Sequence, residues 1–398
     1  MMQNRPPDRS QVMASLLAFA AHNAPYYRDQ AWASGVRAGK PLRFADLPIT
    51  PKQDVKDQVE QFYAQRVPAS EGQILEKYTS GSTGVALRVL KTKRHFAINT
   101  EENQRLADGW GRGEYKTVVH TSYAEQGHEA GSVTETVGAN DFHHWRVYSF
   151  ASPLVADLLE KTRAPHFNSR PSVVLGALLE DKDFSFLRLI STVSEIIPPE
   201  LRVLVSKLPD CRLFDSYGTV ETGILASACA ICGQYHTAAG HAHIEVLKDG
   251  RPAQPGEMGK VVVTPLFNLA MPLIRYDLED YVEIAAPGGC ERPGLTFSKI
   301  IGRERNLFTL PEGGRVTPNI PPEDVLALGI RQYKLIQRTL TEVDLLYVPQ
   351  SPAIEISQGV AQRLVDENLS PGIRASVHKV AEMPLSLGGK FLMHESLL

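Results

Sequence analysis

The sequence predicts an α/β protein with a large, multi-layer N-terminal domain whose sheets are mainly parallel, followed by a small α+β C-terminal domain. Three observations predict this fold class. Short apolar runs read as strands, stretches with helical spacing separate several of these runs, and the pattern changes after residue 302. Strands that alternate with helices favour layers of helices around a largely parallel sheet.

The first expected element is a helix at residues 11–23, where apolar residues recur at helical spacing and the pattern stops before Pro25. Strands are expected at 116–122, 187–195, 211–217 and 259–266, and helices at 151–162 and 198–208. Ligands of such sheets bind in loops at the carboxyl ends of strands. We therefore expect functional residues to follow these strands.

The chain changes character after Ile301-Gly302-Arg303. Two adjacent strands are expected at 330–348, then a helix around 358–368 and a strand near 373–380. These elements make a compact α+β unit. We place the boundary so that the N-terminal domain spans residues 1–302 and the C-terminal domain spans residues 303–398.

The composition is that of an ordinary soluble enzyme, with 43% hydrophobic and 22% charged residues in a chain of 398. The formal net charge of −3 gives no field that would gather nucleic acid or acidic membranes. No apolar run approaches the roughly 18 residues that span a bilayer, and the polar start does not resemble a signal peptide. We expect a cytoplasmic protein without nucleic-acid or membrane partners, and no disulfide framework from its four cysteines.

A loop rich in glycine and hydroxyl side chains is the most informative segment. It consists of Thr79, Ser80, Gly81, Ser82, Thr83 and Gly84. Glycines let backbone N–H groups turn toward a ligand, and the hydroxyls add short donors, so such a loop can wrap a polyphosphate. The alternative is a polar surface turn. The loop is not that of P-loop NTPases, because Val85 and not lysine follows the last glycine.

Four further motifs follow this loop. They are DSYGTVE at 215–221, IRYDLED at 274–280, IGR at 301–303 and PLSLGGKF at 384–391. In this order and spacing, the motifs and the loop resemble the adenylate-forming superfamily of acyl-CoA synthetases, peptide-synthetase adenylation domains and luciferases. The phenylacetate–CoA ligase branch is the most similar. The likeness covers most of the chain and implies that family's fold, with a mobile C-terminal domain.

The resemblance implies a nucleotide site that binds ATP and Mg²⁺. Thr79 to Gly84 match the loop that grips the β- and γ-phosphates. Tyr217 matches the aromatic residue that stacks on adenine, Glu221 the acidic residue that holds Mg²⁺, and Asp280 the carboxylate that accepts hydrogen bonds from ribose. Without the motifs, Tyr217 would be interpreted as a core tyrosine, and Glu221 and Asp280 as solvated carboxylates. Ser194 and Glu195 match a segment of the adenine pocket more loosely. Further contacts are expected from the remaining motif residues: Asp215, Ser216, Gly218, Thr219 and Arg303.

Lys390 matches the family's catalytic lysine, which lies on a glycine-rich loop of the small domain and swings into the site. A cation there can meet both the substrate carboxylate and the α-phosphate. It would stabilise the crowded negative charge as the carboxylate oxygen attacks phosphorus. The alternative is an exposed tail lysine, against which Gly388 and Gly389 argue.

The chain departs from the family pattern at several positions. Val85 replaces the usual lysine, and Glu279 stands where glycine or another uncharged residue is usual. Arg305 and Asn306 replace an acidic pair at the hinge, and residues 311–314 are an insertion. These changes bear on domain rotation and on the second half-reaction more than on adenylation.

A cysteine and histidine cluster predicts a metal site. Cys229, Cys232 and His236 form C-x₂-C-x₃-H, and Cys290 lies further on. Thiolates and imidazole at this spacing fit tetrahedral zinc, and several phenylacetate–CoA ligase-like proteins have a similar cluster, which implies a structural Zn²⁺. The alternative is that these cysteines are reduced and have no joint role. Cys211, in an expected strand, reads as a small buried hydrophobe.

The segment after the strand at 116–122 lines the acyl pocket in related ligases. Here it includes Tyr123, Gln126, Gly127 and His128. Tyr123 could stack on a flat ring, and Gln126 or His128 could bond a ring hydroxyl or amine. Because buried polar groups must be satisfied, these residues suggest a substituted aromatic acid.

The resemblance implies that a carboxylate and ATP give acyl-AMP and pyrophosphate. Coenzyme A is the commonest acceptor among the nearest relatives, while a carrier-protein thiol, an amine and an inorganic nucleophile such as nitrite stay open. A different class of function is a catalytically silent nucleotide-binding protein, against which the retained Glu221, Asp280 and Lys390 argue. Analogy with relatives suggests a homodimer.

Overall fold

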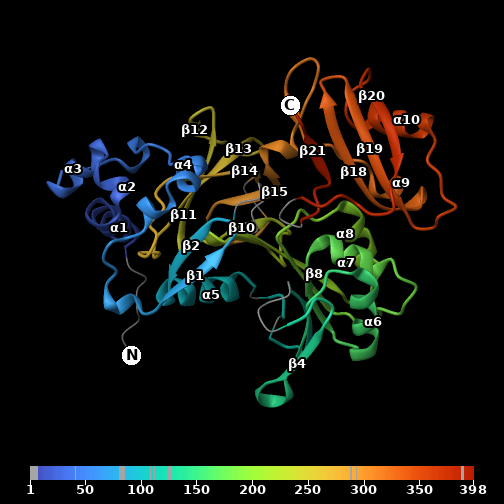
Figure 1. Ribbon diagram of the computed structural model, residues 1–398, viewed down its shortest axis with the longest axis horizontal. Coiled ribbons are helices and arrows are strands. Elements are labelled where there is room, and N and C mark those ends of the chain that lie inside the picture. Colours follow the sequence, from blue (N-terminus) through green and yellow to red (C-terminus); the bar gives the residue numbers. More distant parts are fainter. Residues whose placement is uncertain are drawn as a thin grey trace. The chain divides into compact units, whose positions relative to one another are not determined.

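The computed structural model (Figure 1) describes residues 8–40, 42–79, 86–107, 109–111, 113–122, 128–286, 289–292, 294–386 and 390–398. The chain forms two compact units. The first unit is Met1–Leu106 with Tyr217–Ile300, and the second is Ala107–Ser216 with Ile301–Leu398. The second unit thus contains the expected C-terminal domain and a central part of the expected N-terminal domain. The boundary at 302/303 stays a prediction.

The helices of the first unit begin with α1 (Arg9–Asn23), which confirms the helix expected at 11–23. Asp8 caps it, because its carboxylate accepts a 3.0 Å hydrogen bond from the Ser10 N–H. The other helices are α2 (Pro25–Arg28), α3 (Ala31–Arg37), α4 (Lys52–Asp57) and α5 (Lys93–Ala107), with 3₁₀ turns at Phe44–Asp46, Val59–Phe62 and Ala69–Glu71.

The strands of the first unit pair in antiparallel fashion wherever their register is described. A hairpin joins β1 (Ile74–Tyr78) to β2 (Arg88–Thr92). The other strands run in the order β12-β11-β13-β14-β15-β10-β9. Their bounds are β9 (Gly223–Ala228), β10 (Tyr235–Thr237), β11 (Ala242–Lys248), β12 (Arg251–Pro252), β13 (Met258–Pro265), β14 (Tyr276–Ile284) and β15 (Thr296–Arg303). The described residues between these strands contain no helix, so turns connect the strands and antiparallel pairing follows.

The second unit contains the parallel sheet that the sequence predicts. Its strand order is β8-β7-β6-β3-β5-β4, and only the edge pair β4–β5 is antiparallel. Helices α6, α7 and α8 lie side by side (Figure 1) over a core that includes Phe167, Ile190 and Leu201. The bounds are β3 (Thr117–Thr121), β4 (Val133–Val137), β5 (His143–Val147), α6 (Ser152–Thr162), β6 (His166–Ser169), α7 (Pro171–Leu178), β7 (Leu189–Val193), α8 (Pro199–Ser206) and β8 (Arg212–Thr219), with a 3₁₀ turn at Ala139–Asp141.

The C-terminal part of the second unit is a four-stranded sheet in the order β20-β19-β18-β21. The predicted pair of adjacent strands is β18 (Ile330–Thr339) and β19 (Glu342–Pro349), which are antiparallel, and the predicted helix is α10 (Gln358–Asn368). The other elements are a 3₁₀ turn at Glu304–Asn306, β16 (Phe308–Thr309), β17 (Arg315–Val316), α9 (Pro322–Ala327), β20 (Arg374–Lys379) and β21 (His394–Ser396). The expected α+β unit is confirmed. Across the described ranges of the chain, no helix is long and apolar enough to cross a bilayer.

Candidate functional site

A tight turn between β8 and β9 carries Glu221. A side chain at Gly218 would collide with the backbone oxygen of Gly223 and would place its Cβ 2.9 Å from Ile224 Cα, so only glycine fits there. Gly223 has a φ of +83°, in the left-handed region that favours glycine. Within the turn, the Thr219 hydroxyl accepts a 3.2 Å hydrogen bond from the Thr222 N–H. Local sequence therefore fixes the backbone at Glu221.

The Glu221 carboxylate is buried, with 4% of the residue exposed. Its Oε1 accepts a 3.3 Å hydrogen bond from the Tyr276 hydroxyl and lies 3.6 Å from Lys52 Nζ. Lys52 is also buried. Since a buried charge is costly unless a partner compensates it, these two residues form a compensated pair inside the first unit.

Lys52 reaches Glu221 because the segment before α4 lies along the start of β14. Thr50 N–H donates to the Arg275 oxygen and the Thr50 oxygen accepts from Asp277 N–H, both at 2.9 Å. Lys52, the first residue of α4, is then directed at Glu221 and at the Leu278 oxygen, 3.4 Å from its Nζ. Sequence reasoning missed Lys52, since nothing in a single lysine indicates that it is buried.

A second lysine, Lys91 on β2, is also buried. Burial lowers its pKa to about 8, an effect that the negative charge of Glu221 opposes and the positive charge of Lys77 reinforces. As with Lys52, nothing in a single lysine indicates that Lys91 is buried. Two buried amines thus act on Glu221 in a chain whose loop lacks the usual lysine.

Tyr217 and Asp280, which belong to two of the motifs, are in contact. The Tyr217 hydroxyl donates a 2.9 Å hydrogen bond to Asp280 Oδ2. Asp280 lies on the buried face of β14, with 6% of the residue exposed. The preceding residue, Glu279, has a φ of +60°. The structure thereby gives a physical reason for the family's glycine at this position, which here is occupied by a residue less suited to the left-handed region.

The glycine-rich loop closes a hairpin in the first unit. Thr79 N–H donates to the Leu87 oxygen at 3.0 Å, and the Thr79 hydroxyl accepts from the Leu87 N–H at 2.9 Å. These bonds hold the two ends of the loop together. Ser80, Gly81, Ser82, Thr83 and Gly84 lie outside the described residues.

Lys390 and Glu195 meet through the backbone in the second unit. One oxygen of Glu195 accepts from the N–H of Ser172, and the other accepts from the N–H of Phe391, both at 3.1 Å. Lys390 and Ser386 exchange two bonds, of 3.1 Å and 2.9 Å. Ser194 has a φ of +81°, which turns the chain directly after β7. Glu195 is thus engaged with the backbone beside Lys390, and the predicted adenine contact of Ser194 and Glu195 stays a prediction.

The other predicted residues of the second unit have structural contacts. Asp215 is buried and accepts a 2.7 Å hydrogen bond from the Thr192 hydroxyl, and Ser216 lies opposite Val193 in the β7–β8 register. At the expected hinge, Arg303 ends β15. A few residues further on, the Asn306 side chain is buried and donates to the Ile301 oxygen at 3.1 Å.

Of the four residues expected to line the acyl pocket, only His128 is described. The ring of His128 stacks on Tyr148, with centroids 4.2 Å apart and an interplanar angle of 12°. Tyr123, Gln126 and Gly127 lie outside the described residues. The acyl pocket therefore stays a prediction.

The predicted metal ligands come together in the first unit. The donor atoms of Cys229, Cys232, His236 and Cys290 all lie within 4.8 Å of one another. His236 Nε2 is 3.3 Å from the Cys232 sulfur and 3.2 Å from the Cys290 sulfur. Cys229 and Cys232 flank the turn between β9 and β10, and the pairing of β10 with β15 draws Cys290 toward them. Three sulfurs and one imidazole nitrogen are a donor set that suits Zn²⁺.

The first unit thus places buried carboxylates, buried lysines and an aromatic hydroxyl together, and the family of the chain shows that it is an adenylate-forming enzyme. Residues 29–266 match the model of the AMP-binding enzyme family. This match covers more than half of the chain, so the protein belongs to that family and is an AMP-forming ligase. No curated protein matches the sequence.

Solved structures of similar fold include three ligases. A 2-hydroxyisobutyryl-CoA ligase in the postadenylation state, in complex with R3-HIB-AMP, has a TM-score of 0.70 at 17% identity, over 97% of this chain and 88% of that chain. The anthranilate CoA ligase AuaEII in complex with anthranoyl-AMP has a TM-score of 0.59 at 16% identity, over 79% and 64%. ATP-bound MatB from Rhodopseudomonas palustris has a TM-score of 0.56 at 18% identity, over 80% and 66%.

At these identities the likeness shows the fold, and the predicted adenylate-forming fold is confirmed. The phenylacetate–CoA ligase branch, the cytoplasmic location and the homodimer stay predictions.

Proposed function

We propose that the protein converts a substituted aromatic carboxylic acid and ATP to acyl-AMP and pyrophosphate, and then transfers the acyl group to coenzyme A. The observation that carries the proposal is the buried Glu221, compensated by Lys52 and fixed by a glycine-bounded turn. A carboxylate is the ligand type that Mg²⁺ prefers, and Glu221 would hold the ion, which would neutralise charge on the phosphates.

The residues of this chain would divide the work as follows. Asp280 accepts hydrogen bonds from the ribose and orients the Tyr217 hydroxyl, leaving the Tyr217 ring to stack on adenine. Lys52 and Lys91 supply positive charge near the phosphates. As the substrate carboxylate attacks the α-phosphorus and the bond to pyrophosphate breaks, the Lys390 ammonium stabilises the charge on both groups.

ATP–pyrophosphate exchange with a panel of benzoates, aminobenzoates and cinnamates tests the first half-reaction. Exchange that depends on one of these acids supports the proposal. Exchange that prefers a long-chain fatty acid would refute the aromatic substrate. Absence of exchange with every acid, together with retained ATP binding, would favour a silent nucleotide-binding protein.

The Lys390→Ala variant tests the catalytic lysine. We expect exchange to fall about 10²–10³-fold, because a preorganised charge is lost from the transition state. ATP affinity, measured by calorimetry, should change little. Lys379→Ala is the matched control, since Lys379 lies on β20 in an exposed pair with Glu355. Full exchange activity in Lys390→Ala would count against the assignment.

The acceptor is tested by supplying the acid and ATP with one nucleophile at a time and identifying the product by mass spectrometry. Coenzyme A is the proposed acceptor, as the nearest relatives suggest. A faster reaction with a carrier-protein thiol, an amine or nitrite would replace that part of the proposal and leave the adenylation step intact.

We also propose that Cys229, Cys232, His236 and Cys290 hold a structural Zn²⁺. The donor set and its close spacing support this. One zinc per chain is expected by mass spectrometry of the purified protein, and Cys232→Ser should release it and lower Tm. Cys211→Ser, which changes a cysteine outside the cluster, should keep the metal. Equal zinc content in both variants would contradict the site.

A further inference from the structure

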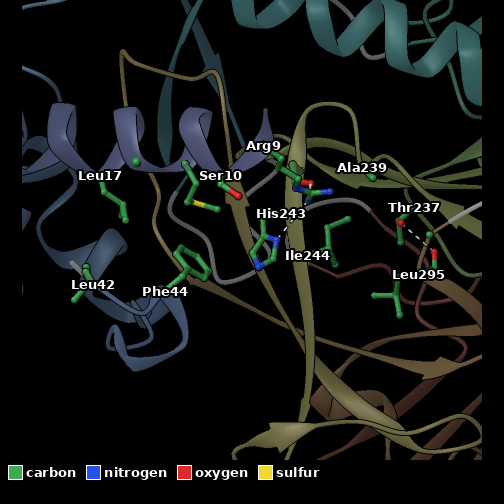
Figure 2. Close-up of a pocket in the computed structure, with 14 residues that line it drawn as sticks. Arg9, Ser10, Leu17, Leu42, Phe44, Thr237, Ala239, His243, Ile244 and Leu295 are labelled. Atoms are coloured by element: carbon green, nitrogen blue, oxygen red, sulfur yellow. Dashed lines mark hydrogen bonds between the residues drawn. The ribbon is translucent and has the colours of Figure 1, made fainter. Parts of the chain in front are cut away.

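A pocket of about 600 Å³ lies in the first unit, between the start of α1 and the start of β11 (Figure 2). The apolar walls come from Leu17 on α1 and Ile244 on β11, together with Leu42 and Phe44. Phe44 begins the first 3₁₀ turn, and Leu42 lies just before it. None of its lining residues belongs to the nucleotide site or to the Cys/His cluster. Its volume is in the range of small-molecule sites, which are mostly apolar with a few placed polar groups.

The polar end of the pocket is formed by Arg9 and His243. Arg9 Nη2 donates to the Ala242 oxygen at 2.8 Å and lies 3.4 Å from His243 Nδ1 (Figure 2). These contacts hold one amino group of the guanidinium. The described part of the chain gives Arg9 Nε and Nη1 no hydrogen-bond partner. Arg9 therefore keeps donors available for a ligand.

His243 is held in one orientation. Its ring meets Phe44 edge to face, with centroids 4.9 Å apart, and burial together with Arg9 and Arg275 lowers its pKa to about 4. The ring is then neutral near pH 7. Because arginine can only donate, Nδ1 must be the acceptor and Nε2 must carry the proton. His243 thus adds a neutral N–H group beside the Arg9 charge.

Among the described residues that line this pocket, no acid offsets the charge of Arg9. The described lining residues include one arginine and no aspartate or glutamate. Asp8, next to Arg9 in the chain, is the N-cap of α1 and accepts from the Ser10 N–H. Near Arg275, Glu245 is bound to the Arg275 guanidinium at 3.0 Å. An apolar pocket that ends in an uncompensated cation is complementary to an anion with an apolar body.

We propose that this pocket is a second, non-catalytic binding site for an amphipathic monocarboxylate. The carboxylate binds Arg9, and a hydrocarbon body of about eight to ten carbons lies against Leu17, Phe44 and Ile244. A nucleotide is a poor match, because a single arginine and apolar walls cannot compensate several phosphate charges. The site does not depend on the proposed function of the protein.

Thr237 and Leu295 connect this pocket to the proposed zinc site. Both line the pocket, and the Thr237 hydroxyl donates to the Leu295 oxygen at 2.9 Å. Thr237 follows His236 directly on β10. A bound monocarboxylate would therefore lie beside Thr237, the neighbour of the predicted ligand His236 on β10, and it should slow zinc loss to a chelator.

Calorimetry with decanoate on the full-length protein tests the proposal. We expect one decanoate per chain. Arg9→Gln should weaken binding about tenfold, because a charge-assisted hydrogen bond is lost while an amide remains. Decanol, with the same body and no charge, should bind the natural protein as weakly as decanoate binds Arg9→Gln. Equal affinity of decanoate for the natural protein and for Arg9→Gln would overturn the site.

Blocking the pocket gives an independent test. Ala14 lines it and is exposed on α1, so Ala14→Trp should fill it without disturbing the core, and decanoate binding should be lost. Ser15→Trp, also exposed and outside the lining, is the control and should bind normally. Asp280→Ala should retain decanoate binding, while Arg9→Gln should retain ATP–pyrophosphate exchange. Binding that survives Ala14→Trp, or that disappears in Asp280→Ala, places decanoate elsewhere and refutes the proposal.

Discussion

Two glutamates, one in each unit, are equally buried and have opposite surroundings. Glu221 in the first unit is 4% exposed, and Lys52 and Tyr276 both reach its Oε1. Glu200 on α8 in the second unit is 3% exposed, and its Oε1 is buried without a hydrogen-bond partner among the described residues. Burial raises the pKa of Glu200 to about 7. The two carboxylates are thus equally buried, but only Glu221 has a described buried cation beside it.

The two units also differ in the contacts that hold the residues of the proposed reaction. In the first unit, side chains hold the carboxylates: Lys52 and Tyr276 hold Glu221, and Tyr217 contacts Asp280. In the second unit, the contacts described around Lys390 are mainly made by backbone groups, from Phe391 to Glu195 and between Lys390 and Ser386. Side-chain pairs preorganise a charge. The contacts described around Lys390 hold the backbone of its loop beside Glu195.

The largest expected effect is that of Glu221→Gln. This change leaves the buried Lys52 ammonium without a compensating charge, which should destabilise the protein by about 3 kcal/mol, as when one partner of a buried pair is removed. It also removes the proposed Mg²⁺ ligand, so exchange should fall by at least about 10²-fold. Urea unfolding followed by circular dichroism measures the first effect, and the exchange assay measures the second.

The double variant Lys52→Met with Glu221→Gln separates stability from catalysis. Removing both charges should recover most of the lost stability, since neither an unpaired cation nor an unpaired anion remains buried. Activity should stay low. If the two single changes add without coupling, the Lys52–Glu221 pair does not stabilise the fold and the contrast with Glu200 disappears.

The Glu200→Gln variant tests the contrast between the two glutamates through the pH dependence of protein stability. In the folded protein the Glu200 pKa is about 7, and its ordinary value is 4.5. Between these values the folded state binds a proton that the unfolded state releases, so stability falls as pH rises from about 4.5 to 7. Glutamine removes that dependence. The variant should match the natural protein at pH 4.5 and be more stable by up to about 3 kcal/mol at pH 8.

Urea unfolding at the two pH values measures this difference, with the exposed Glu382→Gln as the control in the same unit. Equal stabilisation of Glu200→Gln at both pH values would mean that the carboxyl is not held neutral by burial.

The sequence predicted elements whose signal is local. Helical spacing identified α1, α6 and α10, and alternation identified β18 and β19, because the pattern of a helix or strand is contained within it. The direction in which two strands pair depends on the connection between them, so the sequence of a single strand does not reveal it. Among strands β9 to β15, the pairs whose register is described are antiparallel, since turns join the strands in the described part of this region. The helix-separated strands that the sequence predicts belong to the parallel sheet of the second unit.

The residues of the candidate site also differ in whether the local sequence indicates them. Glu221, Asp280 and the cysteine spacing belong to motifs and could be predicted. Lys52 could not, because it reaches Glu221 only through the pairing of Thr50 with Arg275 and Asp277, more than two hundred residues away. The pocket at Arg9 and His243 likewise joins α1 to β11 and leaves no signal in either segment alone.

Tyr217→Phe should have the smallest effect and tests how much of the first unit's preorganisation is due to one hydrogen bond. The change removes the 2.9 Å bond to Asp280 and keeps the ring that would stack on adenine. Nucleotide affinity should fall about fivefold, equivalent to about 1 kcal/mol, with kcat nearly unchanged. The KM for ATP in the exchange assay measures this, and Tyr217→Ala, which also removes the ring, should lose considerably more. If Tyr217→Phe lowers kcat as strongly as KM rises, the hydroxyl acts on the reacting groups, and its assignment to nucleotide binding alone is wrong.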